Sequence, residues 1–388
     1  MDQIAPDSQA LQPGYVGSLK ITDVTTHIVD LPIKRAHQFA ATRISTQAYL
    51  IVEIQTEGGI VGLGEGATPG GPWWSGDSIE TMKTMIDRYL GPAITGRSAH
   101  NINDLHKVMN QVAAANAFAK AAIDIALWDL LGKALETPIY NLLGGAVRDK
   151  LEISWALAVG TVEGDIAEAE EFFERRHARV FKLKAGAQTP EADTERTIAV
   201  ANAMGARGDV RIDPNQRWDE ATARLMFPRL LDGGCSLVEQ PIQSWNIEGL
   251  ARLRRQFNMR IMADESVTTP QTALDVVRNA AADVVALKIM KSGGITGNRQ
   301  ISAILDAGGI AGFGGTFLDS SIGASAALHL AAAERNTSYG CELIGGLWLA
   351  EEIVEEPLVY SDFNVHVPTR PGLGMSLDRK KLRRFSRQ

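Results

Sequence analysis

The segment VFKLKAG, residues 180–186, contains two lysines in an apolar run whose Val and Phe residues favour a strand. Successive side chains of a strand point to opposite faces, so Lys182 and Lys184 share one face. A lysine ammonium inside a protein is costly unless a neighbouring group uses its charge. The segment therefore predicts a buried strand that ends beside a charged site.

Short apolar runs separated by helical patterns continue along the chain from Leu151 onward. We expect eight strands, at LEISWAL (151–157), VFKLK (180–184), DVRID (209–213), SLVE (236–239), RIMAD (260–264), DVVALK (283–288), GIAGFGG (309–315) and YGCEL (339–343). Eight strands that alternate with helices over about 200 residues are typical of a TIM-type (β/α)8 barrel. An open, doubly wound sheet is the alternative, but no glycine-rich dinucleotide fingerprint follows a first strand.

The chain before this barrel has a different organisation. Residues 21–33 and 47–66 alternate as strands do, and a helical pattern covers 116–135, NAFAKAAIDIALWDLLGKAL. Strands followed by helices predict an α+β domain that caps the barrel. We divide the chain into a disordered lead-in (1–17), the N-terminal capping domain (18–148), the modified barrel with the active site (149–355) and a C-terminal segment that returns to the capping domain (356–388).

Composition and charge exclude several classes of protein. A formal net charge of −7 argues against a broad surface for nucleic acid or anionic lipid. No apolar run reaches the roughly 20 residues that span a bilayer. Only two cysteines are present, which excludes a disulfide framework. We therefore expect a cytoplasmic protein without nucleic-acid or membrane partners.

Charged residues end most of the predicted barrel strands. They are Lys184, Asp213, Glu239, Asp264, Lys288 and Glu342. Active sites of such barrels are built at these C-terminal strand ends. Three acids brought together raise one another's pKa, so a bound cation is expected, and oxygen ligands favour Mg²⁺ or Mn²⁺ over zinc. Glu265 competes with Asp264 as the third ligand, and Asp264 is preferred because it ends the strand.

The lysines suggest acid/base chemistry beside the metal. Lys184 lies one strand before the acids, and Lys182 is a cationic neighbour that lowers the cost of deprotonating it. Lys288 is expected across the cavity. Two such lysines can move a proton at the carbon α to a metal-bound carboxylate. An aldolase with a Schiff base on Lys184 would not need the acids, and a metal-binding protein without turnover would not need the paired lysines.

These residues resemble the enolase superfamily and, within it, the muconate-lactonising (muconate cycloisomerase) subgroup. The resemblance is carried by KLK (182–184), RIDPNQRWDE (211–220), LVEQPI (237–242), MADES (262–266), ALKIMKSGG (286–294) and CELIGGLWLAEEIV (341–354). It implies one divalent ion on Asp213, Glu239 and Asp264, with Lys184 as acid/base, Lys182 tuning it, Lys288 on the opposite face and Glu342 reaching in from the eighth strand. Homo-oligomeric assembly is a further implication.

The resemblance also implies that two capping-domain loops, 35–45 and 69–76, cover the barrel mouth and set substrate choice. The implied substrate contacts are Asn215, His37, Ile344 and Trp74. His37 can equally be a solvated loop histidine, and Trp74 can simply pack between the domains. Ile344 stands where many muconate cycloisomerases have an aromatic residue, which leaves room for a substituted substrate.

The expected activity is a metal-dependent cycloisomerase that interconverts cis,cis-muconate, or a substituted muconate, and its lactone through an enolate. The substrate would be a small dicarboxylate. Other members of the superfamily share the half-reaction, so o-succinylbenzoate synthase and N-acylamino acid racemase remain alternatives. The Asp-x-Asp typical of dipeptide epimerases is absent, because this chain has CELIG at the eighth strand.

Overall fold

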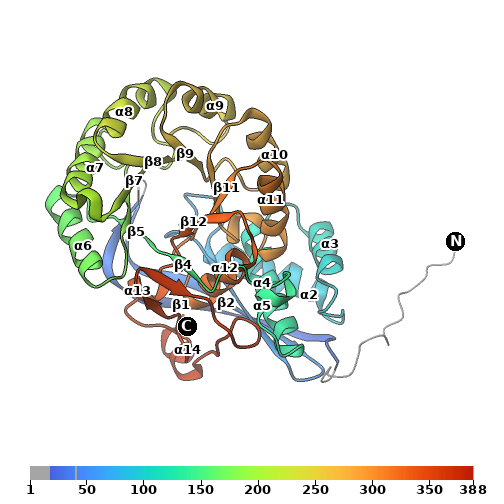
Figure 1. Ribbon diagram of the computed structural model, residues 1–388. Helices are drawn as coiled ribbons and strands as arrows, with labels where there is room; N and C mark the ends of the chain where they lie inside the picture. Colours follow the sequence, from blue (N-terminus) through green and yellow to red (C-terminus); the bar gives the residue numbers. More distant parts are fainter. Residues whose placement is uncertain (1–17, 40–41, 388) are drawn as a thin grey trace.

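The computed structural model describes residues 18–39 and 42–387, and the described residues form three sheets (Figure 1). The predicted lead-in, residues 1–17, lies outside them. The largest sheet has eight strands, and the helices that follow these strands surround it as a ring (Figure 1).

The eight strands of the large sheet are parallel and paired in chain order, as the sequence predicts. They are β5 (Ser154–Leu157), β6 (Val180–Lys184), β7 (Asp209–Asp213), β8 (Cys235–Glu239), β9 (Arg260–Ala263), β10 (Val284–Leu287), β11 (Ala311–Gly314) and β12 (Thr337–Cys341). A parallel bridge between Ile153, just before β5, and Cys341 joins the first strand to the last. The sheet therefore closes, and the barrel fold is confirmed.

The barrel interior combines apolar side chains with the buried cations Lys182 and Arg211, which lie over the Phe313 ring. Leu237, Met262, Val284, Ala286 and Phe313 pack inside the sheet. The outer face is covered by α6 (Val162–Glu174), α7 (Pro190–Met204), α8 (Glu220–Asp232), α9 (Ile247–Gln256), α10 (Pro270–Asn279), α11 (Ile295–Ala307) and α12 (Ser321–Ala333). Two short 3₁₀ turns, η2 (Gly205–Arg207) after α7 and η3 (Met290–Ser292) after β10, complete the connections. Only the four-residue α13 (Gly345–Trp348) follows β12, so the eighth unit lacks a full outer helix.

An antiparallel sheet precedes the barrel, in the order β1 (Ile21–Gln38), β2 (Arg43–Thr56) and β3 (Val61–Ala67). It is followed by α1 (Ile79–Met85), the π-helical η1 (Ile86–Leu90), α2 (Gly91–Ile94), α3 (Ile102–Val112), α4 (Ala117–Ala134) and α5 (Ile139–Leu142). Helix α4 lies against β3 so closely that a Cβ on Gly64 would overlap the Ala122 carbonyl oxygen. Most of α4 is buried, because the barrel covers its other side.

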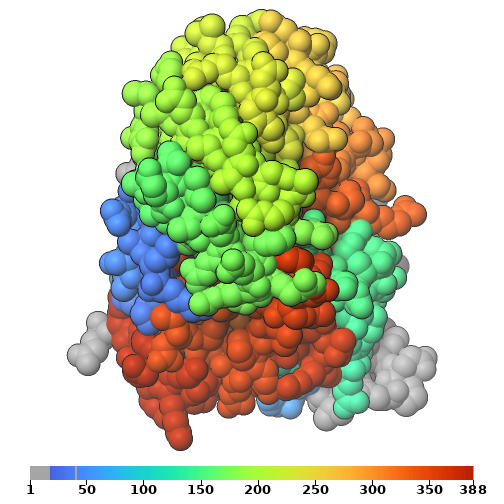
Figure 2. Space-filling view, turned by 60° about the vertical axis from the view of Figure 1, so that its left-hand side comes forward, coloured from blue at the N-terminus to red at the C-terminus, as the bar shows by residue number. Residues whose placement is uncertain are grey.

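The end of the chain lies against the first sheet. Strand β14 (Asn364–His366) pairs with both β13 (Tyr360–Ser361) and β4 (Lys150–Glu152), and α14 (Arg379–Phe385) follows. Arg379 forms an ion pair with Glu53 of β2, and Ser386 bridges to Val29 of β1. Figure 2 shows this red segment below the green and yellow barrel units, beside the blue N-terminal strands. Among the described helices, none is both long enough and apolar enough to cross a bilayer.

Candidate active site

Lysines and carboxylates meet inside the mouth of the barrel. Lys182, on β6, donates to Glu239 Oε2 at 2.5 Å and to Glu342 Oε2 at 2.6 Å. Lys184, at the end of the same strand, donates to Asp213 Oδ2 at 2.8 Å. The Lys182, Asp213 and Glu239 residues are fully buried. The structure thus brings together residues that are up to 160 positions apart in the chain.

A second pair of lysines holds Asp264. Lys288 donates to Asp264 Oδ2 at 2.5 Å, and Lys291 donates to Asp264 Oδ1 at 2.7 Å. The sequence-based prediction omitted Lys291. Its signal was its position three residues after Lys288 in ALKIMKSGG, within the 3₁₀ turn η3 (Met290–Ser292).

The charges of these groups shift one another's pKa. Burial alone would lower the pKa of Lys184, but Asp213, Glu342 and Glu239 outweigh it and hold that pKa above its ordinary value. Burial would likewise raise the pKa of Asp264, whereas Lys288 and Lys291 keep it far below the ordinary value.

The tuning role expected for Lys182 stays a prediction. The sequence predicts that Lys182 eases deprotonation of Lys184, yet the pKa of Lys184 is raised. The reason is that Lys182 lies on Glu239 and Glu342, so those carboxylates compensate its own charge. The net field at Lys184 is therefore that of the acids.

Two residues with left-handed backbone connect the strand ends. Gln240, at φ 32°, accepts from the backbone N–H groups of Asp264 and Ser266 through its side-chain oxygen. Asn215, at φ 46°, donates through its side-chain amide to Asp213 Oδ2 and to Glu265 Oε1, at 3.2 and 3.3 Å. Gln240 was not predicted as a site residue. Strained backbone directly after β7 and β8 therefore helps to position the acids.

The donor set fits a hard divalent ion. Asp213, Glu239 and Asp264 follow three neighbouring strands, and within the described part of the chain Glu239 Oε1 is buried without a hydrogen-bond partner. As the described side chains lie, however, no three acidic, His or Cys groups are close enough to share a metal. Each of the three carboxylates instead contacts a lysine, so an ion would compete with these ammonium groups.

Glu265 behaves differently from Asp264. Burial, Asp264 and Asp213 raise the pKa of Glu265 to about 8. Its Oε2 atom has no hydrogen-bond partner among the described residues, whereas both oxygens of Asp264 accept from lysines. The choice between the two as third ligand stays a prediction.

Aromatic side chains close the mouth above the two lysines. The Trp74 ring centroid is 5.7 Å from Lys288 Nζ and 4.7 Å from the Phe317 ring centroid. With Phe39 and Trp73, these rings leave a space of about 20 Å³ that Lys184, Asn215 and Lys288 also line. Such a volume holds a single water molecule. A larger ligand therefore requires these side chains to move.

His37 and Ile344 lie in the neighbouring cavity, of about 280 Å³. Ala156 lines both cavities, and Phe39, which lines the space at Lys184, packs against the His37 ring with the centroids 4.6 Å apart. Burial, then Arg35, Lys184 and Lys182, keep the pKa of His37 well below 6.5. His37 is thus a buried neutral imidazole, and the alternative of a solvated loop histidine is wrong.

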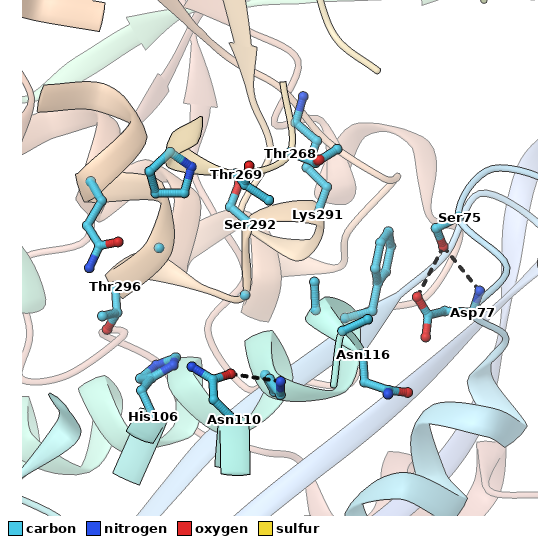
Figure 3. A pocket seen from close by; sticks show the side chains of 18 of the residues that line it. Ser75, Asp77, His106, Asn110, Asn116, Thr268, Thr269, Lys291, Ser292 and Thr296 are labelled. Atoms are coloured by element: carbon cyan, nitrogen blue, oxygen red, sulfur yellow. Dashed lines mark hydrogen bonds between the residues drawn. The ribbon is translucent and has the colours of Figure 1, made fainter. Parts of the chain in front are cut away.

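A third space, of about 1170 Å³, separates α3 and the start of α4 from the barrel loops (Figure 3). His106 and Asn110 line one wall, Lys291 and Ser292 lie across the cleft from them, and Thr296 lies beside His106. Glu265 also lines it, so this open cleft reaches the edge of the carboxylate network.

Two family models match most of the chain. Residues 21–144 match the mandelate racemase / muconate lactonizing enzyme N-terminal domain. Residues 165–381 match the enolase C-terminal domain-like family. The two matches cover the first sheet with its helices and nearly all of the barrel.

Named relatives are similar over nearly their whole length. The chain is 43% identical to muconate cycloisomerase 1 of Rhodococcus opacus over 369 residues, 95% of this chain and 99% of the relative. It is 42% identical over 369 residues to a chloromuconate cycloisomerase of Cupriavidus necator, 95% of this chain and all of the relative. The solved structure of the muconate lactonizing enzyme from Pseudomonas fluorescens with muconolactone superposes with a TM-score of 0.94 at 41% identity, and covers 96% of this chain and all of that one.

Proposed function

The chain belongs to the mandelate racemase / muconate lactonizing enzyme family of the enolase superfamily, and on that premise we propose that it is a muconate cycloisomerase. The proposed reaction interconverts cis,cis-muconate and muconolactone. The observation that carries the proposal is the pair of lysines, Lys184 and Lys288, which line one space next to three buried carboxylates.

The proposed chemistry needs a proton at one carbon of the substrate. One substrate carboxylate oxygen forms a bond to the diene, the electrons of the double bond move toward the other carboxylate, and the carbon α to that carboxylate takes a proton. Lys184 supports this role because its side chain is 11% exposed and lines the space, whereas the Lys182 side chain is 1% exposed. Lys288 is proposed to face the substrate from the other side.

Asp213, Glu239 and Asp264 are proposed to hold one divalent cation, Mg²⁺ or Mn²⁺, with Glu265 as the alternative third ligand. When bound, the cation would stabilise the negative charge that develops on the substrate carboxylate and would neutralise the acids. The acids are what hold the pKa of Lys184 high, so their neutralisation lets Lys184 exchange a proton more readily.

The aromatic residues are proposed to act as a lid. Phe39, Trp73 and Trp74 come from the predicted loops 35–45 and 69–76, and they line the small space at Lys184. A dicarboxylate enters only if they move, and their return excludes water from the reacting carbon. Asn215, His37 and Ile344 are proposed substrate contacts, the latter two from the neighbouring cavity.

Loss of the ultraviolet absorbance of cis,cis-muconate tests the proposal. Protein stripped with a chelator should show no loss, and added Mg²⁺ or Mn²⁺ should restore it. A 2-chloromuconate substrate should be run in parallel. Absence of turnover of both, with metal bound by calorimetry, would sink the assignment and direct attention to α-proton exchange with other carboxylates.

The Lys184→Met variant tests the role of that lysine. The substitution keeps an unbranched side chain but removes the proton donor, so kcat should fall by about 10²–10⁴. Mg²⁺ affinity should persist, because Lys184 is not a proposed ligand. Full activity in Lys184→Met with metal bound would contradict the assignment.

Homo-oligomeric assembly is a further proposal. Leu225 and Trp245 are 68% and 78% exposed, and we propose that a second copy of the chain covers them. Sedimentation velocity measures the assembly state, and a monomer at micromolar concentration would contradict it.

A further inference from the structure

Helix α4 carries two buried carboxylates, Asp124 and Asp129, in a segment that is otherwise almost entirely apolar. Both residues are fully buried. The side-chain carboxylate of each residue accepts a hydrogen bond from a backbone N–H group outside α4. A buried charge on an apolar helix is costly unless such partners compensate it.

Asp124 accepts hydrogen bonds from the first turn of barrel helix α11. Its Oδ2 atom accepts from the Thr296 N–H at 3.2 Å, and its Oδ1 atom accepts from the Thr296 hydroxyl at 2.5 Å. His106 of α3 donates to the same Oδ1 at 2.6 Å. The α11 N-cap residue is Gly294, which has no side chain to do this. A carboxylate from the capping domain therefore replaces the missing cap and opposes the helix dipole.

The chain leaves room for this carboxylate at Gly294. A Cβ there would overlap Asp124, and φ is +103°, a conformation that disfavours other residues. The glycine at position 294 of the SGG sequence (292–294) is therefore what makes space for the Asp124 carboxylate. Gly294 also donates its N–H to the Ile289 carbonyl at 2.8 Å, which closes the turn that begins after β10.

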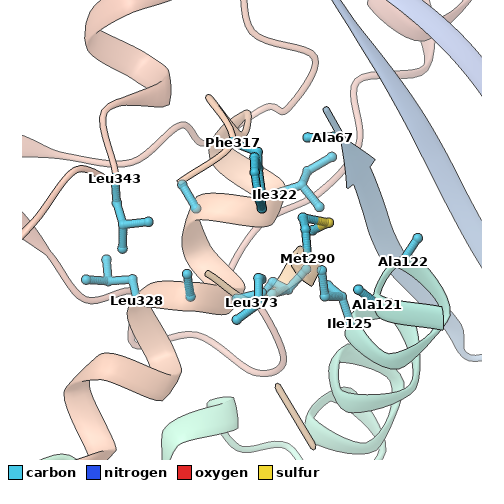
Figure 4. Close-up of a cluster of buried hydrophobic side chains, with 14 of the residues drawn as sticks. Ala67, Ala121, Ala122, Ile125, Met290, Phe317, Ile322, Leu328, Leu343 and Leu373 are labelled. Atoms are coloured by element: carbon cyan, nitrogen blue, oxygen red, sulfur yellow. The ribbon is translucent and has the colours of Figure 1, made fainter. Parts of the chain in front are cut away.

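This turn carries both lysines that hold Asp264. Lys288 lies at its start and Lys291 lies within η3, and Ser292 donates to the Lys288 carbonyl at 3.3 Å. Figure 3 shows Lys291 and Ser292 across the cleft from His106, and Thr296 beside His106, with which it shares Asp124 Oδ1. Figure 4 shows Met290 of the same turn packed beside Ala121 and Ile125 of α4.

We propose that Asp124 is a positioning residue that fixes the turn 288–296, and with it Lys288, from the capping domain. The role of Lys288 toward substrate rests on the proposed function. The position of the turn does not. One end of the turn is fixed by β10, and the other end is fixed by the Asp124–Thr296 contacts.

Hydrogen exchange measured by mass spectrometry tests this on the full chain. Asp124→Asn removes the charge and one acceptor, and Thr296→Val removes the hydroxyl donor while keeping its shape. The exchange rate of peptides that cover 288–298 should rise about tenfold or more in Asp124→Asn. Without the Asp124 cap on α11, local opening of this segment costs less free energy. Thr296→Val should show a smaller rise in the same peptides.

Asp129→Asn is the matched control. Asp129 lies on the same helix and is equally buried, but it accepts from Leu63 N–H, Leu373 N–H and Lys133. It should lower global stability without a selective rise at 288–298. Unchanged exchange at 288–298 in Asp124→Asn, or an equal rise in Asp129→Asn, would overturn the proposal.

Kinetics separate positioning from a general loss of structure. With muconate, Asp124→Asn should lower kcat by about ten- to a hundredfold at saturating substrate, because a displaced Lys288 misaligns the site. At temperatures where it is folded, Asp129→Asn should have the kcat of the wild type. An equal loss of kcat in Asp129→Asn and Asp124→Asn would contradict the proposal. The hydrogen-exchange measurement does not depend on turnover. If the protein does not turn over muconate, the exchange rates at 288–298 still test whether Asp124 fixes the turn.

Discussion

At the scale of the residue, buried carboxylates in this chain are compensated in two different ways. At the barrel mouth the partners are lysines, as at Lys182 with Glu239 and Glu342. Away from it, Glu352 accepts from the backbone N–H and hydroxyl of Ser321. Lysine partners favour the ionised acid. At Glu352 the effect of burial outweighs that of the Ser321 hydrogen bonds, so the pKa of Glu352 rises to about 7.

This pKa predicts how stability depends on pH. Between about pH 4.5 and 7 the folded state holds a proton on Glu352 that the unfolded chain has released, so the free energy of unfolding falls as pH rises. The contribution is fully present below pH 4.5 and is lost above pH 7, and it amounts to at most roughly 3 kcal/mol. Glu352→Gln should therefore flatten the decline and be more stable than wild type at pH 8.

Urea unfolding at pH 5, 6.5 and 8 measures the effect. Glu356→Gln is the control, because Glu356 is only partly buried, forms an ion pair with Arg370, and has a pKa that is lowered rather than raised. An unchanged slope in Glu352→Gln would show that burial does not hold this acid neutral. The pKa of Glu65 is also raised by burial. Part of the decline of stability with pH should therefore remain in Glu352→Gln.

At the scale of the element, the contact between β3 and α4 depends on glycines. A Cβ at Gly62 or Gly64 would overlap the carbonyl oxygens of Ala126 or Ala122. The alternation of glycine in GIVGLGEGA is therefore a packing signal, because α4 lies directly on the strand backbone. At Gly66 the nearest atom belongs instead to the flexible end of Met82.

Two alanine variants test this contact. Gly64→Ala should destabilise by about 1–3 kcal/mol, because two backbones must separate. Gly66→Ala, on the same face of the same strand, should cost clearly less, because the Met82 side chain can move. Denaturant midpoints compare the two, and equal losses would contradict the close approach of α4.

At the scale of the whole molecule, the capping sheet and helices hold the barrel through buried carboxylates. Asp124 caps α11, and Glu65 of β3 accepts from the N–H and hydroxyl of Ser320, the N-cap of α12. Gly323 leaves space for Glu65, as Gly294 does for Asp124. The two barrel helices nearest Lys288 and the lid are thus anchored from outside the barrel.

Metal binding should stabilise the molecule as a whole. An ion that binds only the folded state raises the free energy of unfolding by about 2.7 kcal/mol at a hundredfold excess over Kd. The thermal midpoint should therefore rise with Mg²⁺ or Mn²⁺ over protein in chelator. Glu239→Gln should lose most of this rise, and Glu356→Gln should keep it. A rise of equal size in Glu239→Gln would place the ion elsewhere.

The sequence predicts the fold well for a local reason. Each strand of the barrel is a short apolar run, and its periodicity is visible without knowledge of its partners. Parallel strands place their C-terminal ends on one rim, so Lys184, Asp213 and Glu239 could be assigned to one site from their positions alone. Lys182 and Lys184 both lie on carboxylates of the barrel mouth, which agrees with the face that they were predicted to share.

The remaining features depend on contacts that no local pattern encodes. The sequence by itself determined the strands, their order and which charged groups lie at their ends, because these follow from side-chain periodicity and chain direction. Only the tertiary structure decided that Lys291 joins Lys288 on Asp264, that Gln240 joins β8 to β9, and that His37 is buried against Phe39. Those outcomes depend on which segments from distant parts of the chain pack together, and packing sets both the charge balance and the space that a substrate can use.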